Sequence, residues 1–449
     1  MSPEIRIWIN AVLLFAAQLC VAVIYPSLPI QLGLGILSVS TAWRSVAYRN
    51  GSTSPIALYV FVSAIYVFAA LIEVAYFGNK ANLDPALMGA LTDMGVAFLL
   101  SCTLGFLIRP SPAAPTHRVQ ATSSGAARVA IITCLALLGL SLVITVLTLG
   151  LSIGGLSRSE LYSQDRVLSG LVRGMLAMAF GVAAAFLRSF ELSTGRPAIS
   201  LRVQLFGALA VYALQDLLIF GDRRLPLVAL LGVGSVFLRK RFTWPQVFAA
   251  SLAALVLFAY GFVRNTPPST WLGTLTSGVI LDVISPTSSE FGGMAIIGQT
   301  IGSFKNQVLA FPGYLDAFAQ VIPRSLFPNR PLAPTEWFMA TFYPKLSAAG
   351  ASYAFNQVIE ARLNAGLFGV LAVGFGTGLA MNFTSRLRLQ GAAIGYPIAM
   401  YIFSFSMRMD FSSILRTAII AGLGSGFVYI LILLFRLPQP GRRPVTRLP

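Results

Sequence analysis

Little charge, a single histidine and three cysteines distinguish this sequence. Only 10% of its 449 residues are Asp, Glu, Lys or Arg, whereas 56% are hydrophobic, and the mean hydropathy is +0.78. Such a composition excludes an ordinary soluble domain and predicts that lipid is the main solvent of the chain. The one histidine, His117, lies beside Arg118 in a basic segment, where we expect a solvated loop residue.

The sequence also lacks the motifs of common soluble enzymes. It contains no Walker loop, no dinucleotide-binding fingerprint, no HExxH and no GxSxG. Cys20, Cys102 and Cys134 lie within apolar runs and have neither paired nor metal-ligand spacing. We therefore expect three small buried side chains, no disulfide and no zinc site.

Apolar runs that are long enough to cross about 30 Å of hydrocarbon recur along the chain. The first run has no small-residue cleavage site, so we expect it to be retained as a helix. The sequence predicts an all-α integral membrane protein in which residues 1–449 form a single polytopic domain. About twelve transmembrane helices are expected, at 7–25, 27–43, 55–77, 87–108, 129–150, 168–187, 203–220, 225–238, 245–262, 363–381, 392–407 and 414–435.

The net charge of +17 is distributed unevenly over the loops. If both termini are cytoplasmic, that side holds 18 basic residues, including those of the basic tail 436–449, and only two acids, Glu4 and Glu191. The other side holds the remaining 14 basic and 13 acidic residues. This distribution obeys the positive-inside rule, so it explains the charge without nucleic acid and predicts an inner-membrane protein.

The same orientation places residues 264–362 outside the cytoplasmic membrane. This segment contains many aromatic, Pro and Gly residues, and it is too apolar for a disordered linker and too long for a simple turn. We expect a large extracytoplasmic loop that packs on the outer face of the helices. Long ordered loops over a rigid scaffold often carry function.

Arginines on the outward side are the first candidates for chemistry, because a guanidinium group binds phosphate oxygens through a planar fork. The alternative is ordinary loop charge that pairs with nearby acids. These arginines are Arg158, Arg166, Arg173, Arg223, Arg224, Arg264, Arg324, Arg330, Arg362 and Arg408.

Three charged segments differ from that background. Arg223 and Arg224 interrupt two apolar runs, and Asp216 lies about a turn and a half earlier; either substrate contact or an ion pair is possible there. Arg173, inside a span, could pair with Asp216 or with Asp93, and the sequence does not decide between them.

The second segment is the proline-rich stretch 322–331, which places Arg324 and Arg330 near its ends. Glu360 follows where the next span begins, a position that the helix dipole alone would favour. The third segment is Arg408-Met409-Asp410, an outward turn whose charges could bind a phosphate and an acceptor hydroxyl, or could simply mark the membrane boundary.

In these segments the chain resembles the O-antigen and exopolysaccharide repeat-unit polymerases of Wzy type, within the GT-C-like O-antigen ligase and polymerase group. The resemblance is carried by Pro323-Arg324 to Pro331, by Glu360 to Gly366 in the form E-a-x-x-N-x-G, by Arg408-x-Asp410, and by Gly313-Tyr314. The topology is similar over nearly the whole chain, whereas the motifs cover only 313–410. The outward histidine of the related ligases is missing here.

The resemblance implies a glycosyltransferase in the bacterial inner membrane. It would transfer a glycan from undecaprenyl pyrophosphate to the next lipid-linked repeat on the periplasmic face, building O-antigen, capsule or exopolysaccharide without a metal or cofactor. A chain-length regulator or another assembly protein is an expected partner. The catalytic candidates are Arg324, Glu360, Arg408 and Asp410; the substrate-binding candidates are Arg223, Arg224, Arg264, Arg330, Asn356 and Arg362.

Two other classes of protein stay open. A transporter or flippase of a lipid-linked or anionic solute could line its path with the same arginines, although the chain shows no repeated halves. A structural or regulatory subunit of an envelope assembly would need none of these charges.

Overall fold

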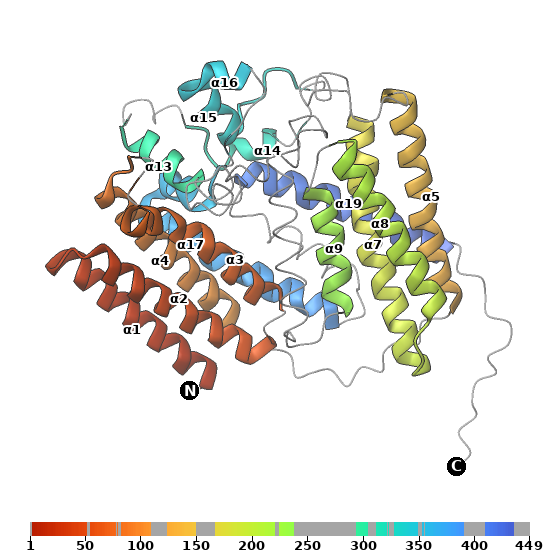
Figure 1. Cartoon of the computed structure of the whole chain (residues 1–449), viewed down its shortest axis with the longest axis horizontal. Helices are drawn as coiled ribbons and strands as arrows, with labels where there is room; N and C mark the ends of the chain where they lie inside the picture. Colours follow the sequence, from red (N-terminus) through yellow and green to blue (C-terminus); the bar gives the residue numbers. More distant parts are fainter. Residues whose placement is uncertain are drawn as a thin grey trace, which may run out of the picture.

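Two hydrophobic cores organise the chain into two helical bundles (Figure 1). The computed structural model describes residues 2–51, 54–77, 79, 82–108, 124–149, 167–220, 224–237, 293–303, 311–320, 322, 327–348, 353, 355–389 and 409–434. Every regular element in these ranges is a helix, which confirms the predicted all-α class.

The first bundle surrounds a core of large buried side chains that includes Tyr59, Leu71, Phe98 and Phe106. Proline lies at the first or second position of its first three helices, where a backbone N–H is not needed, and so helps to define each start. The helices are α1 (Pro3–Ile24), α2 (Leu28–Asn50), α3 (Pro55–Tyr76), α4 (Pro85–Ile108) and α17 (Gln357–Leu389).

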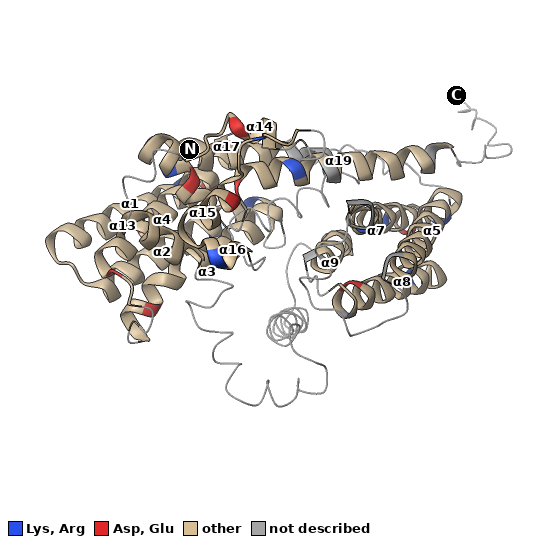
Figure 2. Ribbon diagram, turned by 90° about the horizontal axis from the view of Figure 1, so that it is seen from above, with Lys and Arg blue, Asp and Glu red and all other residues tan. Residues whose placement is uncertain are grey.

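The second bundle has its own core, which includes Phe180, Leu187 and Tyr212. Its helices are α5 (Ser124–Leu149), α7 (Val167–Thr194), α8 (Ile199–Leu218), α9 (Arg224–Phe237) and α19 (Phe411–Leu434). Helix α19 packs against α7 and α5 but also contacts α14 (Asp316–Gln320), so it extends from one bundle to the other (Figures 1 and 2).

Short helices cover one end of the first bundle. They are α13 (Gly293–Ser303), α14, α15 (Pro334–Phe342) and α16 (Pro344–Ala348), and we call them the cap. Met294, Ile297 and Phe338 of the cap are buried in the core of the first bundle. The described part of segment 264–362 therefore packs onto the helices as an ordered layer; the side of the membrane that it faces stays a prediction.

Seven described helices are long and apolar enough to cross a membrane: α1, α3, α4, α5, α7, α17 and α19. Large apolar side chains such as Leu13, Leu147 and Phe368 are exposed on them, and few charges interrupt the ribbons (Figure 2). These helices indicate a membrane protein. Helices α2, α8 and α9 also coincide with predicted spans but are not among the seven. Spans 245–262 and 392–407 lie outside the described residues, so the total of twelve stays a prediction.

Helix α17 begins six residues before the predicted span 363–381. Its backbone leaves the helical conformation at Ala365 and Gly366, where Gly366 has φ +61°. Glycine adopts this left-handed conformation without the steric cost that a side chain would add. The helix thus consists of a short first part, which carries Glu360, and a long second part that packs along α4.

Glycines determine how closely α4 and α17 approach. A Cβ on Gly374 would lie 2.6 Å from the carbonyl oxygen of Phe98, and a Cβ on Gly378 would overlap the carbonyl oxygen of Cys102. The two glycines are four residues apart and form a GxxxG pattern, which allows backbones to pack closely in membranes. Gly376, between them, has no atom within 4 Å of where its Cβ would be.

We therefore expect Gly378→Ala to lower the free energy of unfolding by about 1–3 kcal/mol, because the methyl group must push α4 and α17 apart. Gly376→Ala, the matched control, should leave it unchanged or raise it slightly. Thermal melting of the purified protein in detergent compares the two variants. Equal melting temperatures would contradict the close packing described here.

Polar groups inside the bundles have partners from neighbouring helices. The Arg173 Nη1 atom lies 3.0 Å from Asp216 Oδ1, with the two side chains 12% and 0% exposed. Asp93 instead accepts hydrogen bonds from Gln18 at 2.5 Å and from Gln31 at 3.0 Å. Between the two partners that the sequence left open for Arg173, the structure selects Asp216.

The cysteines only partly follow expectation. All three are free thiols. Cys102 and Cys134 are buried as predicted, and each lies in one of the two cores. Cys20 is exposed, so the prediction of burial was wrong there. It lies on α1, whose apolar surface is mostly exposed, and an apolar run does not by itself distinguish a face toward protein from a face toward lipid.

Candidate functional site

Two buried carboxylates meet where the two bundles and the cap join. Glu360 lies in the first turn of α17 and Asp410 directly precedes α19, and their residues are 1% and 0% exposed. Glu360 Oε2 accepts a hydrogen bond from the backbone N–H of Phe411 at 2.7 Å. The cap contributes Thr335, whose hydroxyl donates to Asp410 Oδ2 at 2.7 Å. Three segments far apart in sequence thus form one buried polar centre.

Local sequence explains where the two helices begin. Asn356 precedes α17, and its Oδ1 atom accepts the N–H of Val358 at 2.7 Å, which is the geometry of a helix cap. Asp410 caps α19 in the same way through the N–H of Ser413, also at 2.7 Å. Asn356, predicted to bind substrate, is therefore a buried residue that caps the N-terminus of α17. Asp410 has the same structural role at α19, whatever chemistry it supports.

Two other residues of the Glu360–Gly366 motif, Asn364 and Gly366, help to fix the position of Glu360. Asn364 accepts the N–H of Tyr314 at 3.1 Å and donates to the Glu360 carbonyl oxygen at 3.0 Å. This pair of bonds joins Gly313-Tyr314 to the first part of α17. Gly366 then ends that part. The motif therefore holds the backbone around Glu360 in a fixed position.

The hydroxyl group of Tyr314 is a further polar group near Glu360. Its ring lies 5.3 Å from that of Phe411 in an edge-to-face arrangement. Its hydroxyl oxygen is buried and forms no hydrogen bond with any residue that the structure describes. Burial, together with the negative charge of nearby Glu360, raises the pKa of this hydroxyl. The group therefore stays protonated and can donate a hydrogen bond.

The two carboxylates differ in how well their charge is stabilised. Asp410 accepts three hydrogen bonds, from Ser412 Oγ, from the Ser413 N–H and from the Thr335 hydroxyl. Glu360 accepts one, on Oε2, and within the described ranges no donor reaches its Oε1 atom. A carboxylate oxygen without a donor is available to accept a proton or a hydroxyl group.

Arg330 lies in the proline-rich loop between α14 and α15 and holds that loop in place. Its guanidinium group donates to the carbonyl oxygens of Gln320 and Ile322 and lies 3.5 Å from Glu336. The Gln320 carbonyl also accepts from Arg416 of α19 at 3.3 Å. These bonds hold the proline-rich loop against α19, the helix that carries Asp410 at its start.

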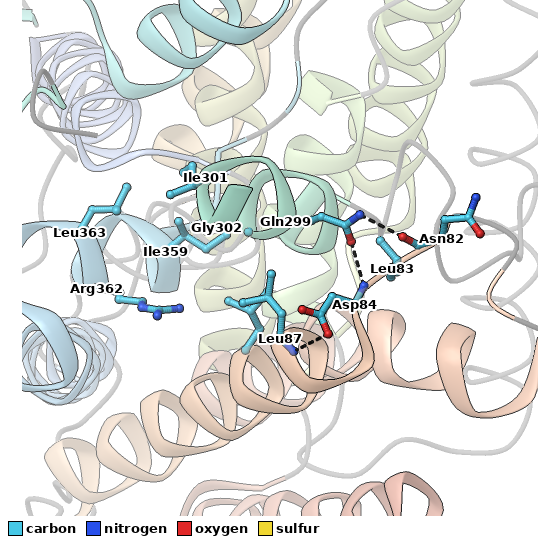
Figure 3. Close-up of a pocket in the computed structure, with 12 residues that line it drawn as sticks. Asn82, Leu83, Asp84, Leu87, Gln299, Ile301, Gly302, Ile359, Arg362 and Leu363 are labelled. Carbon is cyan, nitrogen blue, oxygen red and sulfur yellow. Dashed lines mark hydrogen bonds between the residues drawn. The ribbon is translucent and has the colours of Figure 1, made fainter. Parts of the chain in front are cut away.

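Arg362 belongs to a different place. It lines a cavity of about 640 Å³ between α4, α13 and the start of α17 (Figure 3). Residues 360 and 362 are two positions apart on a helix, so their side chains leave α17 on nearly opposite sides. The structure thus separates Arg362 from Glu360, although the sequence placed both in one motif.

The other predicted site residues lie outside the described residues or are described by their backbone alone. Arg223, Arg264, Arg324 and Arg408 lie outside the described residues, and of Arg224 only the backbone is described, at the first position of α9. In the part of the chain that is described, no group of three or more His, Cys, Asp or Glu side chains is placed to hold a metal ion.

Sequence reasoning missed two groups at the centre. Thr335 follows Pro334 at the start of α15 and is an ordinary helix-start residue by composition. The Tyr314 hydroxyl was noted only as part of a motif. Neither residue carries a charge, and only its distance in space from Glu360 or Asp410 reveals its connection to the site.

Comparisons with known proteins leave the site as the main guide to function. No family model matches the chain, and no curated protein or solved structure is significantly similar to it.

Proposed function

We propose that this chain polymerises lipid-linked glycan repeat units in the bacterial inner membrane. The observation that carries the proposal is the buried Glu360 carboxylate, which lies beside Asp410 and has no donor from a described residue on Oε1. The hydroxyl group of an acceptor sugar is a suitable donor to such an oxygen. The segments that resemble those of Wzy-type polymerases support this proposal, because Tyr314, Asn364 and Asp410 all lie around the same carboxylate.

In the proposed reaction, an acceptor hydroxyl oxygen attacks the anomeric carbon of a glycan carried on undecaprenyl pyrophosphate. The new glycosidic bond forms as the bond to the pyrophosphate oxygen breaks, and the hydroxyl proton passes to Glu360. Asp410 holds Thr335 and the start of α19 in position. No metal is required in this scheme, because arginine can neutralise the charge of the leaving group.

Arg324 and Arg408 are the proposed partners of the leaving pyrophosphate. Arg408 is two residues before Asp410 in the sequence and belongs to the Arg408-x-Asp410 motif. Arg223, Arg224 and Arg264 are proposed to bind the rest of the lipid-linked substrates. Arg330, whose guanidinium group is already bonded within the proline-rich loop, is proposed to position that loop instead. In this scheme the cap faces the periplasm and both termini are cytoplasmic, as the positive-inside rule favours.

Deletion of the gene in its native host, followed by separation of surface glycans on a gel, tests the proposed function. We expect single repeats to replace long chains, and expression of the intact protein from a plasmid should restore the long chains. Complete loss of surface glycan would instead indicate export or ligation. An unchanged ladder of chain lengths would exclude polymerisation of that glycan.

A further inference from the structure

The cavity beside Arg362 lies where two candidate membrane spans begin. Helices α4 and α17 both belong to the candidate spans, and the cavity is lined by residues close to their starts, among them Asp84 beside α4 and Ile359 in α17. The lining residues Leu87 and Leu91 belong to the first two turns of α4. With α4 and α17 across a membrane, whichever side the cap faces, we infer that the cavity lies near the depth where lipid head groups meet the hydrocarbon.

The walls of the cavity are amphipathic. Leu87, Leu91, Ile301 and Ile359 are among the aliphatic side chains that line it, whereas its rim carries polar groups. Gln299 of α13 bridges the rim: its Nε2 donates to the Asn82 carbonyl oxygen at 3.0 Å, and its Oε1 accepts the Asp84 N–H at 3.1 Å (Figure 3). These bonds hold α13 over the start of α4, so the walls of the cavity are fixed by hydrogen bonds.

The charges at the rim do not cancel. Asp84 Oδ1 accepts the N–H groups of Ala86 and Leu87 at 3.0 and 3.4 Å, so its charge is offset by the positive end of α4. Arg362 is exposed and forms no hydrogen bond or ion pair with any residue in the described ranges. An unmatched guanidinium group beside aliphatic walls complements a molecule with an anionic head and an apolar chain.

We propose that this cavity binds a membrane lipid through its phosphate head and the adjoining part of its chain. Arg362 binds the phosphate oxygens, and the aliphatic side chains of α4 and α17 contact the chain. The site goes beyond the proposed glycan transfer, since Arg362 and Glu360 lie on nearly opposite faces of α17. It would hold its lipid whether or not the carboxylates perform chemistry.

Native mass spectrometry of the purified full-length protein in detergent tests this site, with a short-chain phosphatidic acid as the probe. We expect one tightly bound lipid per chain and at least about tenfold weaker binding to Arg362→Gln, because a charge-assisted hydrogen bond is lost. Leu87→Trp should reduce binding by filling the cavity. Arg196→Gln, which changes an exposed arginine between α7 and α8, should bind like the unmodified protein.

Three further measurements could overturn the proposal. Unchanged binding to Arg362→Gln with a normal melting temperature would exclude Arg362 as the phosphate ligand. A diacylglycerol of the same chain length that binds as tightly would exclude recognition of the phosphate. Equal competition by inorganic phosphate would mean an anion site without a lipid chain. None of these readouts depends on glycan elongation, so failure here is distinguishable from failure of the proposed function.

Discussion

Replacing Glu360 with Gln is expected to slow repeat elongation by about 100- to 10,000-fold, the range typical for loss of a general base. The amide keeps the size of the side chain, and its oxygen can still accept the Phe411 N–H that Glu360 Oε2 accepts at 2.7 Å. The variant should therefore insert and fold normally. Elongation of lipid-linked repeats by purified protein in detergent measures the rate, and the melting temperature measures the fold.

Two other variants distinguish chemistry from structure at this centre. Glu4→Gln makes the same chemical change in the first turn of α1, away from the carboxylates, and should elongate repeats at the normal rate. Asp410→Asn retains a good helix cap but loses charge that three donors stabilise, so we expect a lower melting temperature. If Glu360→Gln elongated lipid-linked repeats at the normal rate, Glu360 would have only the structural role of holding the start of α19.

Removal of one member of the Arg173–Asp216 pair is expected to have the largest effect on stability. Asp216 is fully buried, and Arg173 is 12% exposed with its guanidinium carbon 3.8 Å from the centre of the Phe220 ring. Asp216→Ala should cost about 3–5 kcal/mol, because it leaves a positive charge without its partner inside the bundle. Unfolding of purified protein in mixed detergent measures this loss.

The double variant Arg173→Met with Asp216→Leu should recover much of that stability, because no unpaired charge remains. Arg188→Met is the control on the same helix: its ion pair with Glu191 spans 3.5 Å and its side chain is 39% exposed, so we expect a change below about 1 kcal/mol. A double variant no more stable than Asp216→Ala would mean that the cost arises from packing.

Hydropathy predicted the helices well because it depends on each segment alone. Predicted span 55–77 and helix α3 differ by one residue at the C-terminal end, and span 87–108 and helix α4 by two at the start. Helix α17 was placed six residues late, since Glu360 and Arg362 interrupt the apolar run at its start. Charged residues lower the hydropathy of a segment, so hydropathy assigns the segment to a loop even where the charged side chain is buried in a helix, as Glu360 is.

The site was harder to predict because it depends on pairs of distant residues. The sequence proposed Glu360 and Asp410 independently, and the structure brings both to the start of α19. It could not choose the partner of Arg173, since both Asp216 and Asp93 are carboxylates at a suitable depth. It also joined Arg362 to Glu360 because they are close in sequence, whereas helical geometry separates their side chains.

The position of α19 has a mechanical consequence. Its first residue, Phe411, is bonded to Glu360 of the first bundle, while its length packs against α7 and α5 of the second. A change in the angle between the bundles would therefore bend α19 or strain the hydrogen bond from Phe411 to Glu360. Under the proposed function, the bending stiffness of α19 would determine how strongly a tilt of one bundle disturbs the surroundings of Glu360 and Asp410.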